Sequence, residues 1–144
     1  MLLMYDLERI SKIVADMERY LQDLEGFKIK GPEMSREQFY ALSMILFAML
    51  NRTIDLGQEI IRSQKLGMPA SYREIFQILE REKVISKDLS KHLQDLVSKR
   101  NVLAHEYFDV TKESIYAISR KINIVRDLMI VVRSIVHKSK STKR

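Results

Sequence analysis

Residues 35–67, SREQFYALSMILFAMLNRTIDLGQEIIRSQKLG, decide the fold. Ser35, followed three residues later by Gln38, forms a capping box, which predicts that a helix begins here. Apolar residues recur along the stretch at helical spacing and occupy more than one stripe of the helix. We therefore predict that this helix lies at the centre of the domain. Gly67 and Pro69 predict its end.

The flanking sequence predicts four more helices. One spans roughly residues 3–26, a short one follows over residues 71–82, and a fourth begins at Ser86 and ends with the segment 100–107. A fifth begins at Thr111, which serves as its N-cap. No stretch alternates with a period of two for long enough to form a strand. We therefore expect an all-α protein, an antiparallel up-and-down bundle of four long helices and one short helix.

Length and composition indicate one soluble domain. The chain has 144 residues, 46% of them hydrophobic and 31% charged, with only four glycines and two prolines, which excludes disordered and low-complexity classes. We expect a single domain over residues 1–137 and a basic, frayed tail over residues 138–144. The net charge of +6, to which the tail contributes four cations, moderately favours a polyanionic partner.

Several classes of site and location are disfavoured. The absence of cysteine excludes disulfides and thiolate metal sites. The N-terminus has no secretory signal pattern, and no apolar run approaches the roughly 18 residues of a membrane span. His92 and His137 are isolated from other ligands, so we expect no metal and no cofactor. We expect a cytoplasmic protein without a membrane partner.

The segment RNVLAHEY, residues 100–107, is the strongest functional signal. Arg100 lies in the middle of an apolar helical stripe, where an unpaired guanidinium is costly. It therefore either extends to the edge of the stripe or meets a solvated cleft, an anion or an acidic partner, for which Asp55 and Glu59 are candidates. The other members of the stripe are Leu89, Leu93, Leu96 and Leu103.

His105 follows Arg100 by five residues, about 140° around an ideal helix. The two side chains therefore share one small ligand only if Arg100 reaches around the helix, if the helix ends between them, or if a two-fold dimer brings both copies into one cleft. The geometry favours the shared cleft. Asn101 and His105, four residues apart, do lie on the same face.

The pattern Arg100-Asn101-x-x-x-His105-x-Tyr107 resembles the signature of the HEPN superfamily, and specifically its HepT branch, whose motif continues to the tyrosine. Residues 68–110, from MPASYREIF to AHEYFDV, also resemble HepT proteins, and the similarity covers nearly the whole chain. Lys99 is a departure, because relatives often have an aromatic or apolar residue there. The departure raises the local positive charge.

The resemblance implies a HEPN-like fold and a metal-independent endoribonuclease toxin of a type VII toxin–antitoxin system. Arg100 and His105 would be catalytic, and Asn101 would be a supporting polar residue. The RNA, single-stranded or tRNA-like, would be cut by its own 2′-OH, leaving a 2′,3′-cyclic phosphate. The toxin would be a homodimer, silenced when a minimal nucleotidyltransferase antitoxin of the MntA type transfers AMP to Tyr107.

Two other functions stay open at this point. One is a non-catalytic HEPN-family dimer that binds a nucleotidyltransferase partner or nucleotides through the same cleft. The other is a plain helical interaction domain, in which Arg100 and His105 would be buried apart from each other. RNA products with cyclic-phosphate ends would distinguish the ribonuclease function from both alternatives.

Overall fold

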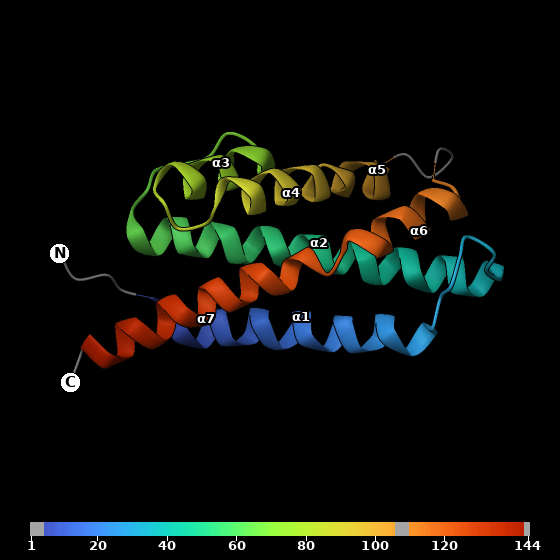
Figure 1. Cartoon of the computed structure of the whole chain (residues 1–144), viewed down its shortest axis with the longest axis horizontal. Coiled ribbons are helices and arrows are strands. Elements are labelled where there is room, and N and C mark those ends of the chain that lie inside the picture. The colour runs from blue at the N-terminus through green and yellow to red at the C-terminus, as the bar shows by residue number, and fades with distance from the viewer. Residues whose placement is uncertain (1–4, 106–109, 143–144) are drawn as a thin grey trace.

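A computed structural model describes residues 5–105 and 110–142, with the backbone alone for His105 and residues 140–142. These residues form helices and no strand, which confirms the predicted all-α class (Figure 1). The elements are α1 (Leu7–Phe27), α2 (Arg36–Gln64), α3 (Tyr72–Arg81), α4 (Lys87–Val97), α5 (Lys99–His105), α6 (Lys112–Lys121) and α7 (Ile124–Thr142).

The central position predicted for α2 is confirmed. It contacts α1, α3, α4, α5 and α6, whereas α7 packs on α4. Figure 1 shows α1 on one side of α2 and the α3–α5 segment on the other, with α6 and α7 crossing the bundle diagonally. The buried face of α2 contains both branched and flexible apolar side chains, among them Leu42, Leu46, Met49, Leu50, Leu56 and Ile60.

Both ends of α2 have the expected local chemistry. Ser35 Oγ accepts a hydrogen bond from the Gln38 amide at 3.1 Å, and the Gln38 side chain accepts one from the Ser35 amide at 3.0 Å, completing the capping box. Lys65 closes the helix in the left-handed conformation, with φ of 55°. Among the described helices, α2 is the one whose length and mean hydropathy, 1.3, also fit a membrane span, but its position at the centre of the bundle accounts for its apolar character.

Two predicted long helices are each divided in two. The predicted fourth helix becomes α4 and α5, with Ser98 between them, and the predicted fifth becomes α6 and α7. Ser98 Oγ donates to the Asp95 carbonyl oxygen at 2.6 Å, a local bond that competes with regular helix geometry. At the C-terminus α7 continues through Thr142, so residues 138–142 of the expected frayed tail are helical.

Gly57 allows α3 to approach α2 closely. A Cβ atom built at this glycine would lie 2.6 Å from Ile75 Cγ2 and 3.3 Å from the ring of Phe76. Any side chain at position 57 would therefore push the two helices apart. This close contact fixes the start of α3, where Tyr72 lies, against α2.

A buried carboxylate fastens α1 to α2. Glu59 is only 4% exposed and accepts a hydrogen bond from Arg9 Nε of α1 at 3.1 Å and others from Arg62 of its own helix. The pKa of Arg62 is raised above its usual value by the hydrogen bond to Glu59 and then by the negative charge of that carboxylate. Glu59 thus links α1 to α2, and its negative charge is balanced by Arg9 and Arg62.

Candidate functional site

Arg100 is held by three helices in a defined orientation. It is half-buried, and its Nε donates to Asn51 Oδ1 of α2 at 3.1 Å, while a terminal nitrogen donates to Asn101 Oδ1 at 3.3 Å. The guanidinium carbon lies 5.3 Å from the centre of the Phe47 ring and 5.5 Å from that of Tyr72. Ring faces attract a cation at these distances. The guanidinium is therefore oriented toward α2 and α3 before any ligand binds.

Neither carboxylate considered as a partner for Arg100 binds it. Asp55 accepts a hydrogen bond from Arg52 at 2.9 Å, and Glu59 belongs to the contact between α1 and α2. Among the residues that the structure describes, no carboxylate lies within ion-pair distance of Arg100. Its partners are two neutral amides and two rings, so its positive charge is not neutralised.

A groove with apolar walls lies beside Arg100, between α2 and α5. Its volume is about 600 Å³. Tyr40 and Met44 on its α2 side are unusually exposed for their type, at 57% and 74% of their surface. The other apolar walls come from Phe39, Phe47, Leu103, Ala104 and Val110. The site is thus a cation at the edge of an exposed hydrophobic surface.

His105 is the last residue of α5, and only its backbone is described. Because α5 includes both Arg100 and His105, the helix does not end between them, which removes one of the three arrangements considered above. Position 105 is about 140° from position 100 and about 40° from position 101, whose side chain is exposed. Arg100 itself is directed toward α2, so it does not reach around the helix to that face.

The structure therefore brings Arg100 and Asn101 together and places His105 on the same short helix. Tyr107 lies outside the described residues. Sequence reasoning missed three contacts of Arg100, namely Asn51, Phe47 and Tyr72. Of these three, Asn51 could have been found from the sequence, because it is a short polar residue at the end of the otherwise apolar run MILFAMLN, four residues after Phe47.

The described residues contain no group of three His, Asp or Glu side chains that could hold a metal ion. His92 lies on α4, 3.6 Å from the Asp88 carboxylate one turn earlier, in an exposed pair. The site therefore offers a fixed guanidinium, that of Arg100, on a helix whose last residue is a histidine. A guanidinium can bind a phosphate diester, and an imidazole can exchange protons with the hydroxyl groups on either side of it.

Comparison with known proteins agrees with the motif and the fold. The model of the family described as "Ribonuclease HepT-like" matches residues 10–135. This chain belongs to the HepT-like family. The resemblance found in the sequence is thereby confirmed.

A curated relative of the HepT-like chain is the "mRNA nuclease HepT" of Shewanella oneidensis. The two are 34% identical over 98 residues, which cover 65% of this chain and 72% of the relative. In fold, the HepT-like chain is similar to the cytosolic protein of unknown function YutE from Bacillus subtilis, with a TM-score of 0.81, 25% identity and 94% coverage of both chains.

A second solved structure is the tri-AMPylated HEPN toxin of Shewanella oneidensis, in complex with its MNT antitoxin. The alignment covers 91% of the HepT-like chain and 99% of that toxin, with a TM-score of 0.71 and 23% identity. At this identity the likeness shows a shared helical fold.

Proposed function

We propose that this HepT-like chain is a metal-independent endoribonuclease, the toxin of a type VII toxin–antitoxin pair. Arg100 holds the scissile phosphate, Asn101 supports it, and His105 transfers protons. The observation that carries this proposal is the state of Arg100: it is oriented by Asn51 and two rings, and no carboxylate among the described residues pairs with it. A fixed, unneutralised guanidinium matches the oxygens of a phosphate diester.

The reaction needs no group beyond RNA and the protein. A base removes the proton of the 2′-OH, and the 2′-oxygen forms a bond to phosphorus. The bond between phosphorus and the 5′-oxygen then breaks, and that oxygen takes up a proton. The products are a 2′,3′-cyclic phosphate and a 5′-hydroxyl. An imidazole, with an ordinary pKa of about 6.5, can serve as base or acid near neutral pH, and Arg100 stabilises the charge that grows on the phosphate oxygens.

The active form that we propose is a homodimer. Within one chain, Arg100 points toward α2, whereas position 105 is on another side of α5. A two-fold axis beside the groove would place both copies of the motif around one cleft. The exposed Tyr40 and Met44 support this arrangement, because aromatic residues and methionine are enriched in interfaces, and so is arginine.

The cleavage chemistry can be tested with single substitutions. We expect Arg100→Ala and His105→Ala each to lower the cleavage rate of a single-stranded RNA by about 10²-fold or more, the usual contribution of such groups. His92→Ala and Arg126→Ala, which remove an exposed histidine of α4 and an exposed arginine of α7, serve as matched controls with near-parental rates. A 2′-deoxy nucleotide at the cut position should abolish cleavage.

Two outcomes would contradict the proposal. If a 2′-deoxy substrate is still cut, the mechanism fails. If the purified chain binds RNA but yields no cyclic-phosphate ends, the non-catalytic binding function is the correct one.

The dimer is tested by charging the groove. Met44→Asp should shift the chain from dimer to monomer in sedimentation velocity and reduce cleavage, because an ion would be buried without a partner. Met68→Asp is the matched control, since Met68 is 94% exposed in the loop before α3 and lines no part of the groove. Unchanged association in Met44→Asp would exclude this interface.

The partner that we propose is a nucleotidyltransferase that silences the chain by transferring AMP to Tyr107. An added AMP would bring negative charge next to the phosphate-binding site. The solved structure of the tri-AMPylated Shewanella HEPN toxin in complex with MNT antitoxin supports this proposal. The description of the Bacillus protein as cytosolic supports a cytoplasmic location for this chain. Mass spectrometry of the chain co-expressed with the antitoxin should show added AMP, and Tyr107→Phe should not carry it.

A further inference from the structure

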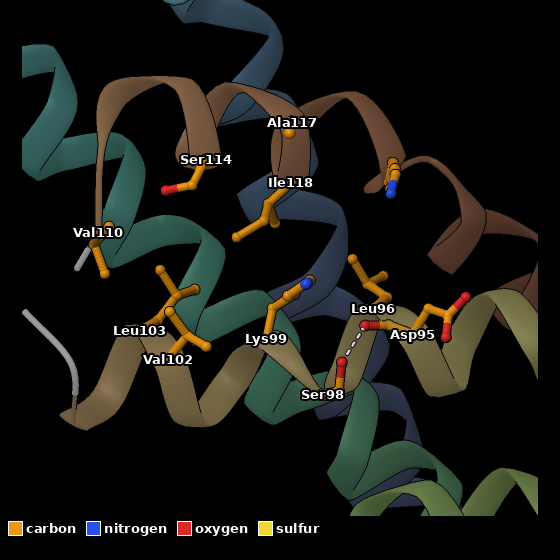
Figure 2. Close-up of a pocket in the computed structure, with 11 residues that line it drawn as sticks. Asp95, Leu96, Ser98, Lys99, Val102, Leu103, Val110, Ser114, Ala117 and Ile118 are labelled. Carbon is orange, nitrogen blue, oxygen red and sulfur yellow. Dashed lines mark hydrogen bonds between the residues drawn. The ribbon is translucent and has the colours of Figure 1, made fainter.

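A second hollow, which we call the α6 pocket, lies on the other side of α5. It is bounded by the end of α4, by α5 and by α6, and its volume is about 430 Å³ (Figure 2). Its floor is apolar, formed by Leu96, Val102 and Ile118. The volume is within the roughly 300–1,000 Å³ typical of small-ligand sites.

Two lysines give the α6 pocket a positive charge. Lys99 and Lys121 both line it, and within the described part of the chain neither forms an ion pair or a hydrogen bond. Figure 2 shows the Lys99 side chain extending into the space between α5 and α6. Of the described lining residues, Asp95 alone is acidic, and its carboxylate points away from Lys99 and lies 3.6 Å from Arg73 of α3. Among the described residues, the two ammonium groups are therefore not neutralised.

The α6 pocket is next to the proposed cleavage site. Lys99 directly precedes Arg100, and their side chains diverge by about 100° around α5. Leu103 and Val110 line both the α6 pocket and the groove beside Arg100. A nucleic acid bound with one phosphate at Arg100 would thus have its neighbouring nucleotide within reach of the α6 pocket.

We propose that the α6 pocket binds one nucleotide unit, with its phosphate between Lys99 and Lys121 and its base on the apolar floor. This inference rests on the proposed function and gives Lys99, the departure from the family pattern, a role. An ammonium group is a compact cation suited to a phosphate, and the floor offers the base a dry surface.

The nucleotide unit has two possible sources with the same chemistry. One is the nucleotide that flanks the cut in the RNA. The other is an adenylate on Tyr107, which comes three residues before Val110 of the pocket lining in the sequence. The experiment below separates them.

The first measurement is the binding of 5′-AMP to the full chain, followed by the methyl NMR signals of Val102, Ala117 and Ile118 and by calorimetry. We expect these signals to shift on addition of AMP. In Lys99→Gln/Lys121→Gln the affinity should fall at least tenfold. The matched control is Lys87→Gln/Lys91→Gln, which removes the same charge from exposed positions of α4 and should change the affinity less than twofold.

The second measurement assigns the source. If RNA supplies the nucleotide, Lys99→Gln/Lys121→Gln should raise KM for a long RNA about tenfold, leave kcat within twofold, and leave cleavage of a dinucleotide unchanged. If Tyr107 supplies it, the adenylylated chain should no longer bind free AMP, whereas Tyr107→Phe co-expressed with the antitoxin should.

Equal AMP affinity in the pocket and control variants would overturn the inference, and so would bound AMP that neither RNA nor adenylylation displaces. Because AMP binding does not depend on cleavage, these results are distinguishable from a failure of the proposed function, which would show as a parent chain that cuts no RNA.

Discussion

Asn51 offers a sharp test of how the site is built. Its side-chain oxygen accepts the hydrogen bond from Arg100 Nε at 3.1 Å, and it touches no substrate in the proposed mechanism. Its role is therefore to position Arg100. Asn51→Ala removes the acceptor and keeps the helix, because alanine is the most favourable helix former.

The size of the effect follows from the contacts that remain. A hydrogen bond to a charged group contributes about 1.5–3 kcal/mol. Asn101 and the rings of Phe47 and Tyr72 still hold the guanidinium in Asn51→Ala, so we expect roughly 1–2 kcal/mol of lost positioning. That loss corresponds to about 5–30-fold in kcat/KM. The cost in folding stability should be smaller, because the guanidinium is only half-buried and can regain a hydrogen bond from water.

Asn51→Asp distinguishes the effect of orienting the Arg100 guanidinium from the effect of its unneutralised charge. The new carboxylate would hold Arg100 at least as firmly as the amide does, but it would neutralise the guanidinium needed by the phosphate. We therefore expect an unchanged or higher Tm together with a larger loss of kcat/KM than in Asn51→Ala. A simple packing role for Asn51 would move Tm and activity in the same direction.

The assay is cleavage of a fluorescent RNA over a range of concentrations, with Tm measured on the same samples. Asn123→Ala is the matched control, because Asn123 Oδ1 also accepts a hydrogen bond from an arginine Nε, that of Arg126, at 3.3 Å, away from the site. If Asn51→Ala and Asn51→Asp both cut RNA within twofold of the control, the orientation of Arg100 by Asn51 has no part in catalysis, and the reasoning is refuted.

Two stability predictions follow from the packing of α3 and α4. Gly57→Ala should lower Tm by several degrees, because its Cβ would lie 2.6 Å from Ile75 and overpacking costs about 1–3 kcal/mol, partly offset by helix propensity. Gly26→Ala, with nothing within 4 Å, should leave Tm unchanged or raise it. Ser90→Ala should lower the free energy of unfolding, measured with denaturant, by about 1–2 kcal/mol. The buried hydroxyl accepts a hydrogen bond from Gln94 Nε2 at 3.0 Å and donates one to the Phe76 carbonyl oxygen of α3 at 2.9 Å. A loss below about 0.5 kcal/mol would contradict this prediction.

The helices could be predicted from the sequence because their start signals are local. Ser35, Ser71, Ser86 and Thr111 each accept a hydrogen bond from an amide of the first turn, as N-caps do. The break at Ser98 could not be predicted, because a serine within a helical pattern is equally compatible with a straight helix. The continuation of α7 beyond residue 137 was also missed, since charge pattern alone does not distinguish a solvated helix from a tail.

The candidate site could be predicted only in part, because only its local features leave a signal in the sequence. Arg100 and its polar neighbours interrupt an apolar stripe, so the sequence alone marks this segment as a candidate site. The partner of Arg100 is 49 positions away in the chain, and long-range contacts leave no spacing signal. Acidic residues such as Asp55 were therefore natural candidates, whereas the partner is the neutral Asn51.

The neutrality of Asn51 matters for the two roles that we propose for α5, phosphate binding at Arg100 and nucleotide binding at Lys99. Consecutive side chains on α5 diverge by about 100°, so Lys99 faces α6 while Arg100 faces α2. An acidic partner for either would have cancelled its charge and closed one side to a phosphate. Because Arg100 is held by amides and rings, and Asp95 is directed to Arg73, both cations remain available. Replacing either arrangement with an ion pair should preserve the fold and remove one phosphate contact, which would appear as a shallower dependence of RNA affinity on salt, by a slope of about 0.7 per phosphate.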